Sequence, residues 1–233
     1  MNYQNVFKRY ELKYLINTEQ YEAIRHKLSE HMVEDKYGKS TISNIYFDTL
    51  NDLLIRRSIE KPVYKEKLRL RSYGAAEKNG IAYVELKKKY DSVVYKRRIA
   101  LLYDEAIDFL LNRKKIKDSQ IVREINYFLD LYGDLKPAEV ISYDREAMYE
   151  RENSDLRITF DKNILCRDYD LSLKKGVYGE SILEDGYTLM EIKTGTSIPL
   201  WLCDVLSKNA IYKTSFSKYG VAYTKKRRKE NAR

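Results

Sequence analysis

The chain has 233 residues, of which 43% are hydrophobic and 34% are charged. This length suffices for one large domain or two small ones with a sizeable core, and the composition excludes a disordered chain. The formal net charge of +9 predicts an anionic partner, and composition alone leaves nucleic acid, a membrane surface and a polyanionic small molecule as candidates.

The N-terminal part of the chain predicts alternating strands and helices. Residues 6–16 alternate polar and apolar side chains, which is typical of a half-buried strand. A helix is predicted over 18–32, with Thr18 as its expected N-cap. Further along, a strand, a short helix and a second strand are expected over 40–49, 51–59 and 63–73.

The middle of the chain predicts a β-hairpin followed by helices. The two strands of the hairpin are expected over 80–90 and 92–101, because an Asp-Ser pair at their junction suits a tight turn. Helices are expected over 104–113 and 119–133, and Gly133 is placed to end the second of them.

The last part of the chain returns to strand-like alternation before a basic tail. Strands are predicted over 136–150, 155–165 and 187–195. A helix is predicted over 199–210, opened by Pro199. The tail, 225–233, begins with KKRRK, which suits a nucleic-acid-binding tail or a solvated helix end. No change in composition marks a boundary, so we expect a single domain over 1–233 with its core at about 5–225.

The sequence lacks the signals of secretion and of a membrane span. No apolar stretch approaches the roughly 18 to 20 residues that a span requires, and the N-terminal MNYQNVFKRY lacks the apolar segment of a signal peptide. Cys166 and Cys203 give neither a disulfide framework nor metal-ligand spacing. We therefore expect a cytoplasmic protein without a membrane span.

The most informative feature is a charged face that recurs in the predicted strands. Alternate residues of a strand point to opposite faces, and over 65–71 every second residue is Lys or Arg. Comparable positions elsewhere are Arg9, Glu11 and Lys13; Tyr83, Glu85, Lys87 and Lys89; Val94, Lys96 and Arg98; Tyr143 and Arg145; Arg157, Thr159 and Asp161; and Glu191 and Lys193.

Two interpretations of these faces are open. An antiparallel sheet often has one face in water, which accounts for any single strand. However, solvated faces usually mix both charges, because like charges on neighbouring strands repel. Here the acids are outnumbered, and they are Glu11, Glu85, Asp161 and Glu191. Two unit charges 4 Å apart interact by about 4 kcal/mol at an effective dielectric near 20, so this crowding favours a polyanionic ligand.

The expected fold class is α+β, with an antiparallel β-barrel flanked by helices. If about eight strands close with their polar faces inward, they enclose a water-filled tunnel. The apolar outer faces would then pack against the predicted helices. Such a tunnel would suit chains of phosphate.

A set of short motifs resembles the bacterial form of the polyphosphate polymerase (VTC) domain, within the CYTH-like, triphosphate tunnel metalloenzyme superfamily. In the family's order the motifs are RYELKYLI, IYFDT, KLRLRSYG, YVELKKK, VVYKRR, SYDREAM, LRITFD, MEIKTG and FSKYG. The resemblance implies an antiparallel tunnel fold that transfers the γ-phosphoryl group of ATP to a growing polyphosphate chain with Mn²⁺ or Mg²⁺. The expected partners are therefore ATP and inorganic polyphosphate, and no specific nucleic acid.

The resemblance also implies roles for individual residues. Those expected at the catalytic centre are Lys13, Arg69, Arg71, Lys87 and Arg145. Those expected to bind phosphate or nucleotide are Arg9, Lys67, Lys96, Arg98, Arg157, Lys193, Ser217 and Lys218. Glu191 takes the metal-binding position, and we expect Glu11 to assist it because hard divalent ions prefer carboxylate oxygens, with Asp161 and Glu85 left open as further ligands.

One departure from the wider superfamily bears on the reaction. Hydrolytic members begin with Glu-x-Glu-x-Lys, whereas this chain has Arg9, Glu11 and Lys13 at those positions. An arginine in place of the first glutamate favours a phosphate acceptor over water. A terminal phosphate is already a nucleophilic oxyanion, so no general base is required, and His26 and His31 are expected at the surface.

Other interpretations stay open. The chain could be a tunnel-type triphosphatase that releases orthophosphate, or a non-catalytic module that binds polyphosphate or RNA. Among single residues, Glu11 and Glu85 could be structural partners of nearby lysines, and Lys65 and Lys89 could face solvent at the ends of a tunnel.

Overall fold

The computed structural model describes residues 10–91, 93–151, 155–195 and 197–231. The chain divides into two compact units. Unit 1 comprises Met1–Thr41, Tyr143–Ile164 and Ser181–Ser217, and unit 2 comprises Ile42–Ser142, Leu165–Glu180 and Lys218–Arg233. Strands β2 (Met32–Asp48), β6 (Lys136–Glu150) and β7 (Arg157–Arg167) each contribute residues to both units. The single domain expected over 1–233 stays a prediction.

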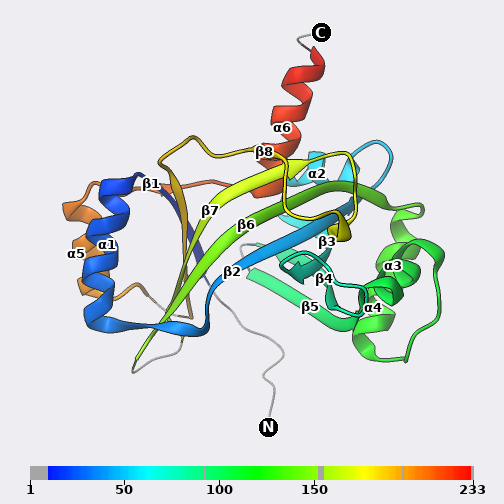
Figure 1. Ribbon diagram of the computed structural model, residues 1–233, viewed down its shortest axis with the longest axis horizontal. Helices are drawn as coiled ribbons and strands as arrows, with labels where there is room; N and C mark the ends of the chain where they lie inside the picture. Colours follow the sequence, from blue (N-terminus) through cyan, green and yellow to red (C-terminus); the bar gives the residue numbers. More distant parts are fainter. Residues whose placement is uncertain (1–9, 92, 152–154, 196, 232–233) are drawn as a thin grey trace. The chain divides into compact units, whose positions relative to one another are not determined.

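Unit 1 combines antiparallel strands with helices (Figure 1). Its strands follow the order β10-β1-β9-β7-β6-β2. The elements not yet given are β1 (Tyr10–Ile16), α1 (Thr18–His31), β8 (Glu180–Ser181), β9 (Thr188–Thr194), α5 (Leu200–Lys208) and β10 (Lys213–Thr214). Helices α1 and α5 contact each other, so both lie over the same part of the unit.

The core of unit 1 forms between the apolar faces of its strands and helices α1 and α5. On β1, Tyr14 and Ile16 are buried, and they belong to one cluster with Ile24 of α1, Ile192 of β9 and Leu202 of α5. Because side chains alternate along a strand, the odd-numbered residues of β1, such as Glu11 and Lys13, point to the opposite face. The charged face of this unit is therefore the one away from its helices.

The start of α1 differs from the predicted one by a single residue. The N-cap is Asn17 rather than Thr18: the Asn17 side chain accepts a hydrogen bond from the backbone N–H of Gln20. The Gln20 side chain in turn accepts one from the Asn17 backbone, at 3.1 Å. This reciprocal pair is a capping box, and it uses the stronger of two adjacent capping residues.

Unit 2 contains the long hairpins and the remaining helices (Figure 1). Its strands follow the order β6-β2-β3-β4-β5. The additional elements are α2 (Leu53–Ile59), β3 (Tyr64–Tyr73), β4 (Ile81–Tyr90), β5 (Val93–Leu102), α3 (Tyr103–Asn112), α4 (Gln120–Tyr132), the 3-10 turn η1 (Leu173–Lys175) and α6 (Lys218–Asn231). The predicted hairpin is confirmed, since Tyr90 of β4 pairs with Val93 of β5.

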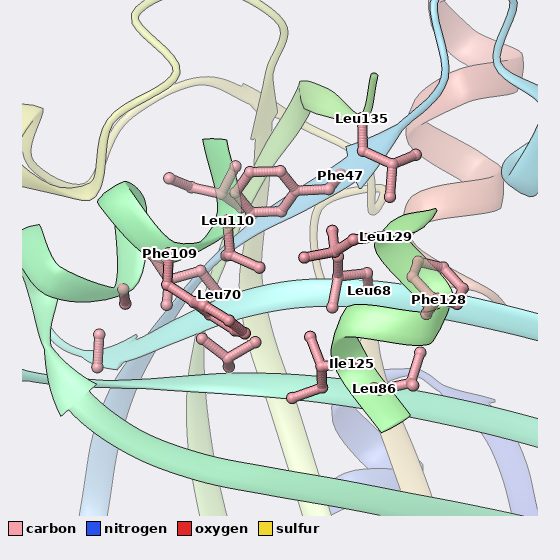
Figure 2. Packing of buried hydrophobic residues seen from close by; sticks show 14 of the residues in the cluster. Phe47, Leu68, Leu70, Leu86, Phe109, Leu110, Ile125, Phe128, Leu129 and Leu135 are labelled. Carbon is pink, nitrogen blue, oxygen red and sulfur yellow. The ribbon is translucent and has the colours of Figure 1, made fainter. Parts of the chain in front are cut away.

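Helices α3 and α4 cover the apolar face of unit 2. Figure 2 shows Leu68 and Leu70 of β3 beneath Phe109 of α3 and Phe128 of α4, and all four belong to one buried cluster. These leucines alternate with Lys67 and the arginines of β3, which lie on the other face. Helices α3 and α4 therefore do not cover the cationic face of these strands.

The fold class is confirmed as α+β with a large antiparallel sheet, while closure of the strands into a tunnel stays a prediction. Helix α4 ends at Gly133, as expected, with a backbone φ of 68° that glycine adopts readily. None of the helices in the described part of the chain is long and apolar enough to cross a membrane.

Candidate functional site

The arginine cluster of unit 2, formed by Arg69, Arg71 and Arg98, surrounds a single carboxylate. Strand registers place Glu85 of β4 between Arg69 of β3 and Arg98 of β5. Glu85 is 1% exposed, and its Oε2 lies 2.7 Å from Nη2 of Arg69 and 3.7 Å from Nε of Arg71. Its Oε1 lies 2.6 Å from Nη2 of Arg98 and 2.7 Å from Nζ of Lys96.

The electrostatics of this cluster follow from one anion shared by four cations. Burial raises the pKa of Glu85, but the attraction of the four cations outweighs it, so the pKa lies well below its usual range and the carboxylate stays ionised. Desolvation lowers the pKa of Lys96 to about 7, and the arginines act in the same direction while Glu85 opposes them. The Lys96 side chain is 41% exposed, so its charge is open to an approaching ligand.

A lysine row lies beside the arginine cluster on the same face. Lys67 of β3 pairs with Lys87 of β4, and Lys87 pairs with Lys96 of β5. Lys65 and Lys89 form the next pair along. Like charges directly opposite one another on neighbouring strands are destabilising. The row therefore favours an anion in contact with it.

Polar side chains of β2 accept hydrogen bonds from two of the arginines. Asn44 accepts a hydrogen bond from Nε of Arg71 at 3.0 Å, and the Tyr46 hydroxyl accepts one from Nη1 of Arg69 at 3.2 Å. The ring of Tyr219, in α6, stacks on Tyr46 with centroids 4.7 Å apart. Sequence analysis did not single out these three supporting residues. Asn44 and Tyr46 could have been found by extending the alternation argument to 40–49.

Unit 1 carries a second charged cluster, which mixes both signs. Its members are Glu11, Lys13, Arg145, Asp161, Glu191 and Lys193. Strand registers place Lys13 of β1 opposite Glu191 of β9, and Glu11 opposite Lys193. The Nζ of Lys13 lies 3.5 Å from Oε1 of Glu191 and 3.8 Å from Oε1 of Glu11. Lys13 thus bridges the two carboxylates expected to bind a metal.

Arg145 is the most firmly held cation of this cluster. Its Nε and Nη2 donate to the two oxygens of Asp161 at 2.6 and 2.7 Å, in the fork arrangement typical of Arg–carboxylate pairs. The same Nη2 lies 3.8 Å from Oε2 of Glu191, and the Tyr143 ring lies 5.0 Å from the guanidinium. Lys193 completes the set, with its Nζ 3.3 Å from Oε2 of Glu191.

The remaining predicted residues fall at several places. Arg157 donates to Asp35 at 2.7 Å, a partner that sequence analysis missed. Ser217 belongs to unit 1, and Lys218 begins α6 in unit 2 and is buried. Arg9 lies outside the described residues.

The sequence profile of the VTC domain family matches residues 8–226, nearly the whole chain. The chain belongs to the VTC domain family. This result confirms the resemblance that the motifs suggested. A search of curated proteins finds no match to this VTC domain.

Solved structures similar to this VTC domain show the same fold at low identity. A candidate adenylate cyclase from Bacillus halodurans is 16% identical, with 92% of this chain and 96% of that chain covered and a TM-score of 0.58. A candidate adenylyl cyclase from Hippeastrum, described as having a dominant triphosphatase activity, is 17% identical, with 93% and 95% covered and a TM-score of 0.56. These likenesses show that the two proteins and this VTC domain share a fold.

The structure refines the prediction that acids are outnumbered on the charged faces taken together. That description fits the cluster of unit 2, where Glu85 contacts Arg69, Arg71, Lys96 and Arg98. In unit 1 the acids match the bases, because Glu11, Asp161 and Glu191 lie among Lys13, Arg145 and Lys193. The VTC domain therefore separates a cationic face from a face that also offers carboxylates.

The carboxylates of unit 1 suit a hard divalent ion that also binds phosphate. Across the described ranges, no group of three or more His, Cys, Asp or Glu side chains is arranged to hold a metal ion by itself. Mg²⁺ and similar ions usually take one or two carboxylates and gain further ligands from substrate phosphates. Glu11 and Glu191, both near Lys13, are the two carboxylates that would form such a pair. Asp161 is already held by Arg145 in a two-point contact.

Proposed function

We propose that this VTC domain is an ATP-dependent polyphosphate polymerase. It would transfer the γ-phosphoryl group of ATP to the end of an inorganic polyphosphate chain, with Mn²⁺ or Mg²⁺ bound. The observation that carries the proposal is the arginine cluster, where four cations share one buried carboxylate. Membership of the VTC family supports it.

The cationic face of unit 2 has the chemistry to hold a chain of phosphates. Arg69, Arg71 and Arg98 each present a planar fork of donors, which suits two-point contact with phosphate oxygens. The lysine row supplies compact charges that attract phosphates with less geometric demand. An anion on this face would relieve the repulsion between neighbouring cations, so its binding is favoured by the protein's own charge distribution.

In unit 1, the proposed roles divide between phosphate contacts and metal ligands. Lys13 and Arg145 would orient and neutralise phosphate oxygens, assisted by Lys193. Glu191, with Glu11, would hold the divalent ion. The ion would neutralise charge on the transferring phosphoryl group. Positioning and charge neutralisation are the main demands of phosphoryl transfer.

The nucleophile in this proposal is the terminal phosphate of the polyphosphate acceptor. It is already an oxyanion, so the VTC domain needs no general base to activate it. The positions of the two histidines agree with this, because both lie in α1. His31 stacks on Trp201 with ring centroids 4.1 Å apart. Neither histidine belongs to the charged clusters of unit 1.

A triphosphatase is the second candidate. The triphosphatase activity described for the Hippeastrum protein favours it, since that structure shares this fold. Such an enzyme would pass the phosphoryl group to water and release orthophosphate. A third candidate, a non-catalytic binder of polyanions, would use the same cationic face without turnover.

One incubation separates the three candidates. The purified protein is mixed with ATP and Mn²⁺, and the products are resolved by gel electrophoresis and assayed for ADP and orthophosphate. Long polyphosphate with an equivalent amount of ADP is expected. Orthophosphate without polymer would identify a triphosphatase, and unchanged ATP that remains bound would identify a binder.

A further inference from the structure

An exposed apolar patch lies on the cationic face of unit 2, directly beyond the arginine cluster. Tyr73, Ile81 and Leu102 are 51%, 58% and 49% exposed. They occupy the same alternating positions as Arg71, Glu85 and Arg98 on their strands, so they share that face. Tyr83 completes the patch, which we call the tyrosine patch: Tyr73, Ile81, Tyr83 and Leu102. Apolar side chains are unexpected on a face that otherwise suits phosphates.

The two aromatic rings of the patch are fixed against the arginine cluster. Tyr73 and Tyr83 meet edge to face, with centroids 5.9 Å apart and ring planes at 85°. The guanidinium of Arg98 lies 4.3 Å from the centroid of Tyr83, and the same guanidinium donates to Glu85 at 2.7 Å. Burial lowers the pKa of the Arg98 guanidinium, whereas Glu85 and the Tyr73 side chain raise it. The patch and the cluster are therefore one connected surface.

Along the direction of β4, the shared face passes from the tyrosine patch to the arginine cluster and then to the lysine row. Tyr83 lies opposite Arg71, Glu85 opposite Arg69, and Lys87 opposite Lys67. With about 3.4 Å per residue, the tyrosine patch lies roughly 7 Å from the centre of the arginine cluster and roughly 14 Å from the lysine row. A ligand that matches this sequence has a flat apolar group at one end and a row of phosphates at the other.

We propose that the tyrosine patch binds the base of the nucleoside triphosphate, with Tyr73 as its main stacking surface. This inference rests on the proposed function, because it assigns the donor nucleotide a position on the same face. The base would lie on Tyr73, its phosphates over the arginine cluster, and the polyphosphate chain toward the lysine row. Stacking tolerates any base, since every base presents a π-face, so discrimination among nucleotides is expected to be weak.

Binding measured without turnover tests this assignment. Affinities for ATP and for inorganic triphosphate are measured by calorimetry, in EDTA, for the wild type and for Tyr73→Ala, Tyr73→Phe and Tyr90→Ala. Tyr90 is a matched control, because it is 56% exposed at the other end of β4. Inorganic triphosphate carries the phosphates without the base.

We expect Tyr73→Ala to weaken ATP binding about tenfold, the effect of losing one stacked base, and to leave triphosphate binding within about twofold. Tyr73→Phe keeps the ring and removes only the hydroxyl, so it is expected to bind both ligands like the wild type. Tyr90→Ala is expected to change neither affinity.

Two results would overturn the inference while leaving the proposed function intact. The first is an equal loss of ATP and triphosphate binding in Tyr73→Ala and Tyr73→Phe, which would show that Tyr73 only positions Arg98. The second is unchanged ATP binding in Tyr73→Ala. Failure of the wild type to bind either ligand, both in EDTA and with Mg²⁺ added, would instead reject the proposed function, and the assignment of the patch with it.

Discussion

At the scale of single residues, Glu85 and Glu191 are two buried carboxylates with different surroundings. Glu85 is shared by four cations, and those contacts leave it no role as a metal ligand. Glu191 contacts Lys13 and Lys193 at 3.5 and 3.3 Å and lies near Glu11 through Lys13. Glu191 is also 3.8 Å from Arg145, so both carboxylates lie among cations, and the metal-binding role is proposed for Glu191 because Glu11 is nearby.

Replacing Glu191 by Gln should separate turnover from binding. The substitution keeps the size of the side chain and removes the charge that a divalent ion requires. We expect the rate of polyphosphate formation to fall by at least about a hundredfold, while triphosphate affinity stays within a few-fold of the wild type, because the arginine cluster is untouched. Radiolabelled ATP turnover and calorimetry provide the two readouts. Retained turnover would remove Glu191 from the metal site.

The charge of Lys96 should make anion binding depend on pH near neutrality. Because its pKa is lowered to about 7, Lys96 loses its charge as the pH rises through that value. A bound anion favours the protonated form, so triphosphate affinity should be strongest below about pH 7 and fall above it. A one-unit rise of the pKa on binding would change the affinity about tenfold between the two limits.

The control for this pH effect is Lys96→Arg, which stays charged throughout the range. Titration of the ligand itself is common to both proteins, so the difference between their affinity profiles reports Lys96 alone. Parallel profiles from pH 6 to 9 would contradict the prediction.

At the scale of elements, Asp48 joins strand β2 to two helices. Its Oδ1 accepts from the backbone N–H of Leu54 at 2.8 Å, and its Oδ2 accepts from that of Ile55 at 2.9 Å, both in the first turn of α2. The hydroxyl of Tyr219, in α6, donates to Oδ2 at 3.0 Å. Burial raises the pKa of Tyr219, and Asp48 adds to the effect, so this hydroxyl keeps the proton that it donates.

Substitution of Asp48 by Asn should therefore destabilise the fold. An amide has a single acceptor oxygen, so donors that now meet Oδ2 would face an N–H₂ group while buried. Each buried donor without a partner costs about 1–3 kcal/mol, and we expect a loss of about 2 kcal/mol in the free energy of unfolding, measured with urea. Asp52→Asn is the matched control, because the Asp52 side chain makes no capping hydrogen bond. An equal loss in both variants would argue against this role.

The same scale shows what the sequence could and could not predict. Strand periodicity alone places Lys67, Arg69 and Arg71 on one face, whatever lies beside the strand, so alternation identified that face correctly. It could not tell which strands are neighbours. That Glu11 and Glu191 lie close together in unit 1 became evident only from the pairing of β1 with β9, which are far apart in sequence.

Supporting residues were harder to predict than the charged ones. Tyr219 stacks on Tyr46 although more than half of the chain separates the two residues in sequence, and no local pattern indicates such a contact. Alternation placed Tyr83 on the charged face, but Tyr73 was not singled out, and the contact between the two rings depends on the pairing of their strands. Capping was ambiguous for a different reason, since Asn17 and Thr18 are both good N-caps.

At the scale of the whole molecule, the net charge of +9 raises the question of whether position or total charge attracts the ligand. Two double variants with the same net charge separate the effects. Lys67→Gln with Lys87→Gln removes charge from the lysine row, whereas Lys114→Gln with Lys115→Gln removes it from an exposed loop between α3 and α4. The first pair should weaken polyphosphate binding about tenfold, and the second less than about twofold.

Filter-binding titrations at 150 mM salt would measure these affinities, since screening over about 8 Å suppresses the long-range part of the field. Equal losses in the two double variants would mean that total charge, rather than the arrangement of the lysine row, governs affinity. That outcome would also weaken the case for the cationic face as the binding surface.

The buried carboxylate at the centre of the arginine cluster has one further consequence. Any phosphate that reaches these guanidinium groups must share them with a resident anion that cannot diffuse away. Glu85 thereby limits the affinity of the arginines for phosphate. A comparable limit applies in ion channels, where a site must bind the ion weakly enough to release it. In the proposed polymerase, the growing chain would have to move along these arginines, and arginines without a competing carboxylate would bind it too tightly for that movement.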